Sequence, residues 1–274
     1  MVKAVTRYRI ITHTYDCTDP PRPSCPDGKI DFHVECATDR PRLVDSKWHD
    51  TLETQIRSNG DLEKRFVLKL DVGGAEWDAL MGTPDEILAR IDQMAVEFNG
   101  FNERRFLDVV RKMKQTFYIA NLHFNNYACT GDGAPLTASV YEVLFVNKRI
   151  GVLDKAVQGT PLPSIKNVRN DPSQPDCQPE VPDATARMAA RRQALLDELR
   201  PVALQNCTLA RYGSPNDGGY LMCQNLVENL GAGYSYGVGP NDDWGCDVST
   251  RYKVPMHQYD CFDPTPPACS GGAG

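Results

Sequence analysis

The sequence lacks any excess of positive charge and any long apolar run. Asp and Glu outnumber Lys and Arg by 36 to 30, and the formal net charge is −6. Nucleic acids and anionic membranes are bound through clustered Lys and Arg, and a membrane span needs about 18 consecutive apolar residues. The first residues also lack the apolar segment of a signal peptide. We therefore expect a cytoplasmic protein that acts on a small molecule, with neither nucleic acid nor membrane as partner.

Zinc-site spacing is also missing, although the chain has ten cysteines. No Cys-x-x-Cys pair or Cys/His cluster is present, so no metal site is expected. The pairs Cys17/Cys25 and Cys261/Cys269, together with the sequon at Asn206, would instead suit an oxidising, secretory compartment. Buried free cysteines are the alternative.

The chain nearly repeats itself across its two ends. Residues 5–25 (VTRYRIITHTYDCTDPPRPSC) align without a gap on residues 249–269 (STRYKVPMHQYDCFDPTPPAC), with eleven of twenty-one positions identical. About one domain of unique sequence separates the copies, so a row of short solenoid repeats is excluded. The chain is therefore either a circular permutant that retains the duplicated segment or a piece of a tandem array.

Strand and helix patterns alternate along the first half of the chain, which is typical of parallel βαβ units. Residues 66–72 form a nearly continuous apolar run, as expected of a buried central strand. Residues 102–114 have apolar side chains at helical spacing. Two closing strands, 115–124 and 140–147, have no helix between them. We also expect strands over 8–15, 30–36 and 94–98, and a helix over 84–94 that opens with Pro followed by acidic residues.

A proline-rich segment divides the chain. Residues 159–183 contain six prolines and are predicted to be a surface linker. A helix over 183–200 follows, with Asp183 as its expected N-cap. A strand over 233–239, a short helix over 244–252 and the second copy of the repeat then complete a β-turn-α-β unit.

Candidate ligand-binding residues stand at the ends of the strands in this unit. Gly237-Val238-Gly239 follows the first strand, where glycines allow close backbone approach to a cofactor. Asp263 follows the next strand, where a carboxylate can accept hydrogen bonds from ribose hydroxyls. An ordinary turn and a helix-capping Asp are the alternatives. The third glycine of a dinucleotide motif is missing, which favours a cofactor without pyrophosphate.

Several segments resemble FkbM-type S-adenosylmethionine-dependent methyltransferases. Residues 67–80 (VLKLDVGGAEWDAL) are similar to the family's fourth-strand motif LKIDIEGAEW, and residues 211–220 (RYGSPNDGGY) resemble the DGGY segment before its first strand. Residues 234–239 and 262–264 resemble its cofactor-binding strands, and residues 94–98 and 121–125 resemble its fifth- and sixth-strand ends. Gly73 stands where the family usually has Glu, so the role of that carboxylate is absent or supplied by another residue.

The resemblance implies an α/β class I methyltransferase fold, which is Rossmann-like, with a seven-stranded, mostly parallel sheet and a terminal antiparallel hairpin. Its order here is permuted: residues 1–25 are a duplicated second-strand arm, 26–158 the back half, 159–183 the linker and 184–274 the cofactor-binding front half. The implied activity is methylation of a hydroxyl on a sugar or another small molecule with S-adenosylmethionine. The implied cofactor-binding residues are Asp71, Asp217, Gly218, Gly237, Val238, Gly239 and Asp263.

Transfer of a methyl group to a hydroxyl requires an aligned acceptor and a base that takes its proton. Asp71 and His123 are the candidates: Asp71 ends a buried strand, and a histidine titrates near neutrality. A turn-capping role for Asp71 and a structural role for His123 are the alternatives. Glu97 and Glu76 could assist, or could simply cap a helix or pair with Arg104 or Arg105.

Two other functions stay open from the sequence. The chain could be an inactive methyltransferase-fold binding protein or relic, with Gly73 as the supporting feature. It could also be an oxidoreductase on a similar sheet, although the missing third glycine and the missing Tyr-x-x-x-Lys pair count against this.

One sheet has a single position for the duplicated strand. We expect the C-terminal copy to occupy it, because the short βαβ crossover that precedes it is locally favoured and Phe262 keeps the family motif that Thr18 breaks. The N-terminal copy would then be a loose arm, an edge strand or a strand exchanged in a swapped homodimer.

Deletion of residues 1–23 should therefore leave folding and cofactor binding intact. Thermal unfolding followed by circular dichroism tests this. Loss of the folded state on deletion would show that the N-terminal copy fills the sheet position.

Overall fold

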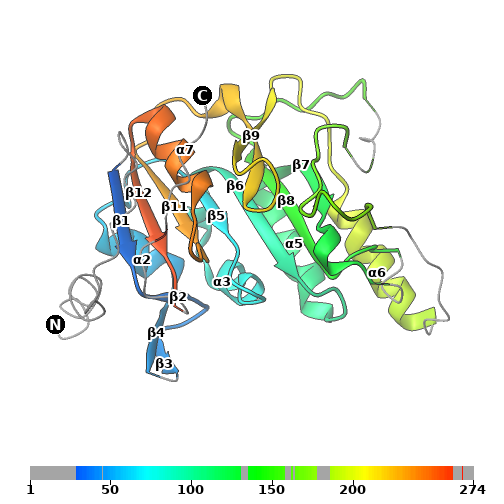
Figure 1. Ribbon diagram of the computed structural model, residues 1–274, viewed down its shortest axis with the longest axis horizontal. Coiled ribbons are helices and arrows are strands. Elements are labelled where there is room, and N and C mark those ends of the chain that lie inside the picture. The colour runs from blue at the N-terminus through cyan, green and yellow to red at the C-terminus, as the bar shows by residue number, and fades with distance from the viewer. Residues whose placement is uncertain are drawn as a thin grey trace.

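The computed structural model describes residues 29–44, 46–130, 135–157, 162, 164–177, 186–261 and 267. Its centre is a seven-stranded sheet with the order β1-β12-β11-β5-β6-β8-β7 (Figure 1). The first five strands are parallel, whereas β8 runs antiparallel to both β6 and β7. The strands span β1 Lys29–His33, β12 Pro255–Tyr259, β11 Ala232–Tyr236, β5 Phe66–Leu70, β6 Ile91–Asn99, β8 Val140–Asn147 and β7 Phe117–Phe124.

The C-terminal copy of the repeat lies inside this sheet. Its strand β12 pairs with β1 on one side, where Asp31 is opposite His257, and with β11 on the other, where Tyr234 is opposite the same histidine. Helix α7 (Asp243–Tyr252) makes the crossover from β11 to β12, and the Asp242 side chain accepts the N-capping hydrogen bond from Gly245 N at 2.9 Å. The N-terminal copy lies outside the described residues.

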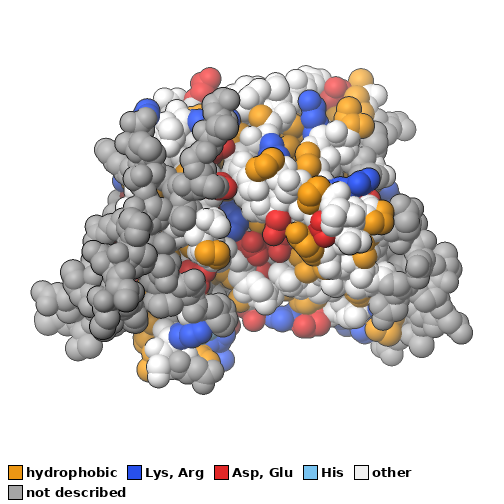
Figure 2. Space-filling view, viewed as in Figure 1, with side chains coloured by type: hydrophobic (Ala, Val, Ile, Leu, Met, Phe, Trp, Pro, Cys, Tyr) orange, Lys and Arg blue, Asp and Glu red, His pale blue; other side chains and the backbone are white. Residues whose placement is uncertain are grey.

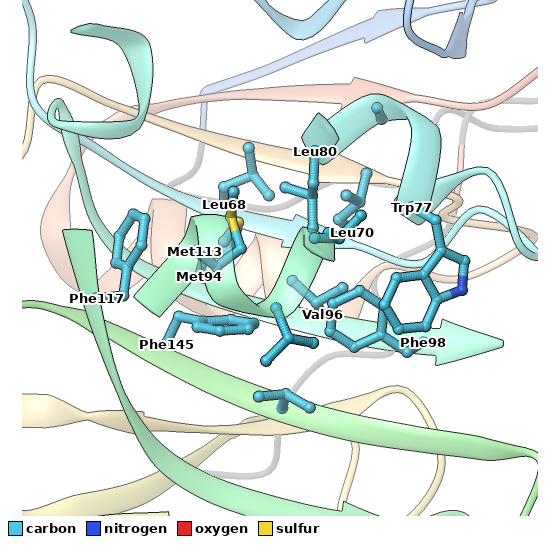
Figure 3. Close-up of a cluster of buried hydrophobic side chains, with 14 of the residues drawn as sticks. Leu68, Leu70, Trp77, Leu80, Met94, Val96, Phe98, Met113, Phe117 and Phe145 are labelled. Atoms are coloured by element: carbon cyan, nitrogen blue, oxygen red, sulfur yellow. The ribbon is translucent and has the colours of Figure 1, made fainter. Parts of the chain in front are cut away.

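The larger hydrophobic core lies between the sheet and the helices of one face. Inward residues of β5, β6 and β8 alternate with outward ones and pack against α2 (Leu52–Ser58), α3 (Glu76–Gly82), α4 (Asp85–Leu88) and α5 (Arg104–Thr116). Trp77 of α3 stacks between Phe98 of β6 and Phe106 of α5, with ring centroids 4.1 and 4.0 Å apart. Figure 3 shows Trp77 beside Phe98, and Leu68, Met94 and Val96 in the same cluster. Helix α6 (Ala186–Leu199) packs on α5 and adds Leu195, Leu196 and Leu199.

A second, smaller core covers the opposite face. It contains Val67 and Ala95 from the sheet, Trp244 and Val248 from α7, and Tyr212 and Tyr220 from an antiparallel hairpin. The hairpin consists of β9 (Leu209–Gly213) and β10 (Gly219–Cys223), and in Figure 1 it lies in front of the sheet in gold. A small separate sheet contains β2 (Cys36–Ala37), β3 (Arg42–Val44) and β4 (Lys47–Asp50). Short 3-10 helices cover Asn126–Ala128 and Gln224–Leu226.

Most expected elements are confirmed, with shifted ends, and one is wrong. The predicted helix over 84–94 ends at Leu88, and β6 begins at Ile91. The continuous burial of residues 91–96 explains the difference, because a strand covered on both faces carries no alternating pattern that would mark its start. The predicted strand 30–36 is also divided between β1 and β2. The predicted N-cap Asp183 lies outside the described residues.

Among the described residues, disulfides join Cys36 to Cys261, Cys129 to Cys177, and Cys207 to Cys223. The expected pair Cys261/Cys269 is wrong. Because β12 lies beside β1, Cys261, which follows β12, is close to Cys36, which follows β1, and the two form a disulfide. In the part of the chain that the structure describes, no helix is both long and apolar enough to span a membrane.

The two copies of the repeat provide a matched pair of substitutions. Tyr259 is 1% exposed and stacks on His33 and Tyr236, so Tyr259→Ala should lower the free energy of unfolding by about 3 kcal/mol. Tyr15→Ala, at the equivalent position of the other copy, should change it by no more than about 0.5 kcal/mol. Urea unfolding of both variants measures this, and a larger loss for Tyr15→Ala would contradict the placement of β12.

Candidate functional site

The carboxyl ends of the parallel strands meet at one edge of the sheet, where β11 lies beside β5. The chain leaves β11 toward β12 on one side and leaves β5 toward β6 on the other, so this is a topological switch point. Ligands in open α/β sheets bind at such a point. The backbones of Gly237 and Asp71, the residues that follow these two strands, are in close contact: a Cβ on Gly237 would lie 1.5 Å from Asp71 O.

A cavity of about 450 Å³ lies on the β12 side of this point. Gly73, Gly237 and Gly239 line it, and Gly73 and Gly239 have left-handed φ angles of 62° and 55° with open space where a Cβ would be. Asp260, directly after β12, accepts a hydrogen bond from Gly239 N at 3.0 Å. The other lining residues are Glu35, Cys36, Ala37, His49, Asp71, Val72, Ala75, Tyr259 and Cys261.

A second cavity, of about 710 Å³, shares Asp71, Gly237 and Gly239 with the first. It lies toward the hairpin and is strongly acidic. Figure 2 shows Asp and Glu side chains near the middle of the face that carries the hairpin. The acidic lining residues are Asp71, Glu97, Asp217, Asp242 and Asp243, and Gly218, Val238, Asn125 and Ser214 are among the others.

Asp71 is held by two buried groups. Tyr220 of the hairpin donates its hydroxyl to Asp71 Oδ2 at 2.9 Å, and Lys69 Nζ lies 3.4 Å from the same oxygen. Lys69 also donates to Gly237 O at 3.1 Å. Burial alone would lower the pKa of Lys69, but the nearby carboxylates of Asp71, Asp242 and Glu97 raise it, so the ammonium stays charged. Lys69 thus joins the ends of β5 and β11.

A row of ionisable side chains continues from Asp71 across the sheet. Glu97 on β6 is opposite Glu142 on β8, which is opposite His123 on β7. Burial, followed by repulsion from Asp71 and Glu142, raises the pKa of Glu97 to about 9. Burial likewise raises the pKa of Glu142 to about 7. Glu97 is therefore protonated at neutral pH and can donate a hydrogen bond, but it is a poor base.

Asn170 connects this row to the proline-rich segment. Its amide nitrogen donates to Glu142 Oε1 at 2.8 Å and to Asp217 Oδ1 at 3.0 Å. Its Oδ1 therefore faces His123 Nε2, 2.9 Å away, and that nitrogen must carry the proton. The described residues 164–177 are mostly exposed, as a surface linker predicts, but Asn170 is only 1% exposed.

His123 lies apart from the Asp71 cavities. It lines a third cavity, of about 530 Å³, together with Arg169, Asp176 and Arg200. Burial lowers the pKa of His123, and its Nε2 proton is already donated to Asn170. The structure thus gives His123 the environment of the structural alternative, and its role as a base remains a prediction.

Glu76 holds the turn after β5. Its Oε1 accepts hydrogen bonds from Val72 N at 2.8 Å and from Asn99 Nδ2 at 3.3 Å, and burial raises its pKa to about 7. Arg105 pairs with Asp78 and Glu103, rather than with Glu76 or Glu97. Asn125 Nδ2 donates to Glu97 Oε2 at 3.2 Å.

The structure brings together six of the seven expected cofactor residues, since Asp71, Asp217, Gly218, Gly237, Val238 and Gly239 all line the larger cavity. Asp263 lies outside the described residues and remains a prediction. Sequence reasoning missed Lys69, Tyr220, Glu142, Asn170 and Asp260 as members of the site. A lysine inside the apolar run 66–72 was the available signal for Lys69.

Comparisons with protein-family models, curated proteins and solved structures gave no match.

The buried Glu142 predicts a pH dependence of stability. Its pKa is about 7 in the folded protein against an ordinary 4.5. Stability should therefore fall as pH rises from about 4.5 to 7, because over this range Glu142 ionises in the unfolded chain but not in the folded protein. Glu142→Gln keeps an acceptor for Asn170 and should remove on the order of 3 kcal/mol of this loss. Urea unfolding at pH 5 and pH 8 measures it.

Glu86→Gln is the matched control, because Glu86 is exposed. Its unfolding free energy should fall with pH as in the unaltered protein. An equal fall in Glu142→Gln would mean that Glu142 is already ionised when folded at neutral pH.

Proposed function

We propose that this protein is an S-adenosylmethionine-dependent methyltransferase that methylates a hydroxyl of a small molecule, with its fold in permuted order. Counted from β11 through β12 and then on from β1, the strand order of the sheet is 3-2-1-4-5-7-6. The first five positions follow the doubly wound order, in which the ligand crevice lies between strands 1 and 4. Those strands are β11 and β5, which carry the Gly237 turn and Asp71. This agreement supports both the proposed fold family and the permutation.

The observation that carries the proposal is the pair of cavities that meet at Gly237, Gly239 and Asp71. The residues present fit the cofactor. Gly239 leaves open space for close approach, and Asp260 and Glu35 place carboxylates beside the smaller cavity, where ribose hydroxyls could donate to them. When bound, the cofactor would supply a methyl group on a positively charged sulfur.

The larger cavity suits that positive charge. Besides the protonated Glu97, its described lining has four aspartates and one lysine, Lys69, whose ammonium is already shared between Asp71 and Gly237 O. A cation is stabilised by such surroundings, because charges in a partly buried site are weakly screened. Asp71 lines both cavities and is the carboxylate that would take a proton from an acceptor hydroxyl, whereas Glu97, with a pKa of about 9, is protonated at neutral pH.

The disulfides support a secretory or otherwise oxidising compartment rather than the cytoplasm. The sequon does not add to this. Asn206 Nδ2 donates to Ile150 O at 2.8 Å, and its Oδ1 accepts from Val152 N at 2.7 Å. A glycan on this nitrogen would disturb the first of these hydrogen bonds.

An inactive binding protein is the second candidate, favoured by Gly73. Gly73 has a left-handed φ of 62°, a backbone conformation that Glu rarely adopts. Glycine at this position therefore allows this conformation and at the same time removes the carboxylate. Such a protein would bind the cofactor without transferring its methyl group.

Titration with S-adenosylmethionine and with S-adenosylhomocysteine tests the proposal. Each ligand should raise the melting temperature and give a saturable heat in calorimetry, because a ligand that binds only the folded state stabilises it. Gly239→Asn tolerates the left-handed backbone but fills the cavity, and should weaken binding at least about tenfold, or about 1.4 kcal/mol.

Gly60→Asn is the matched control. Gly60 also has a positive φ, 75°, and open space around it, but lies at the end of α2 outside both cavities. It should bind like the unaltered protein. Absence of binding by both ligands would overturn the proposal, and binding without methyl transfer to any hydroxyl acceptor would favour the inactive alternative.

A further inference from the structure

Two histidines and an aspartate converge where β1 meets β12, on the face of the sheet that carries the larger hydrophobic core. Asp31 and His33 are two positions apart on β1, so their side chains share a face, and Asp31 is paired with His257 of β12. Asp31 Oδ2 lies 3.4 Å from His33 Nε2 and 3.6 Å from His257 Nδ1. Within the described residues, this is the one group of three such side chains whose ligand atoms all lie within 4.8 Å of one another.

The outer contacts orient His257 as a metal ligand. Asp61 Oδ2 lies 3.2 Å from His257 Nε2, so that nitrogen donates to Asp61, and Nδ1 is the ring nitrogen on the side of Asp31 and His33, where a metal ion would take the place of a proton. Tyr234 donates to the same Asp61 oxygen at 2.8 Å, and Lys64 pairs with the other at 2.5 Å. A carboxylate behind a histidine is the usual support of a metal-bound imidazole.

Burial and access also suit an ion. His33 is fully buried and stacked on Tyr259, with ring centroids 4.4 Å apart, and His257 is 7% exposed. The Asp31 side chain is 50% exposed, which leaves a path from solvent. Bonds of about 2.0–2.2 Å to a tetrahedral ion place neighbouring ligand atoms about 3.3 Å apart, close to the two shorter separations here.

We infer that Asp31, His33 and His257 form a binding site for a divalent first-row metal ion, with zinc as the best fit and one coordination position open to water. Imidazole nitrogen with carboxylate oxygen is a ligand set that zinc accepts, and three protein ligands leave a fourth position free. None of the three residues lines the cavities around Asp71, so the inference does not rest on the proposed methyltransferase function.

Sequence spacing did not predict this site, since its ligands come from two distant segments and include no cysteine. The repeat adds a built-in comparison. His257 aligns with His13 in the N-terminal copy, so both copies carry the same ligand type at the same position.

Titration of the chelator-treated, full-length protein with Zn²⁺ and with Co²⁺ tests the inference. We expect one equivalent of Zn²⁺ by calorimetry, a higher melting temperature, and the visible absorption of Co²⁺ bound in a low-symmetry site with nitrogen ligands. Asp31→Asn keeps the side-chain shape and should weaken Zn²⁺ binding at least tenfold. His257→Ala should abolish the Co²⁺ absorption.

His13→Ala is the matched control and should bind Zn²⁺ and Co²⁺ as the unaltered protein does. Three results would overturn the inference: no Zn²⁺ or Co²⁺ binding at micromolar concentration, binding unchanged by Asp31→Asn, or binding lost in His13→Ala but kept in His257→Ala. If His257→Ala does not fold, Asp31→Asn alone decides, because its side chain is half exposed.

Discussion

The close contact between Gly237 and Asp71 joins the two halves of the molecule. Asp71 N donates to Tyr236 O at 3.2 Å, and Gly237 N donates to Tyr259 O at 2.8 Å, so three strand ends are fixed together. Any side chain at Gly237 would collide with the Asp71 carbonyl, and its φ of 69° is itself left-handed. Both cavities meet at this contact, because Asp71 and Gly237 line each of them.

Much of this arrangement could be predicted from local patterns. The strand over 140–147 has the predicted bounds, and the apolar run at 66–72 is the central strand β5. The glycine turn and Asp71 were expected at one edge because the carboxyl ends of parallel strands meet there. The prediction of one helix over 84–94 was wrong in its second half. The first turn does form a helix, which ends at Leu88, but burial in the sheet makes the residues from Ile91 onward a strand.

The missed residues depend on contacts between distant segments. Asn170 lies in a proline-rich stretch whose composition predicts exposure, but Asn126 exchanges hydrogen bonds with the backbone of Asp171, and the Cys129–Cys177 disulfide fixes the same stretch. Tyr220 belongs to a hairpin whose packing over β6 and β8 no local pattern encodes. The burial of Glu142 depends on both. A linear pattern identifies which residues end strands, but not which loop lies over them.

The duplicated strand shows how a few side chains and the chain connectivity together can favour one of two similar segments. The copies are identical at the positions of His257, Tyr259, Asp260 and Cys261, and all four are used where β12 lies. These side chains therefore cannot distinguish one copy from the other. Other positions of the strand differ: Met256, buried in the smaller core, and Gln258, which donates to Asp242 Oδ2 at 2.7 Å, correspond to Thr12 and Thr14 in the other copy. The connection differs as well, because α7 brings β12 back beside β11 through a short crossover, and a short connection costs less closure entropy than a distant one. The choice of β12 thus depends on the crossover between Gly237 and Pro255 and on the two buried side chains that the other copy lacks, whereas the shared side chains favour neither copy.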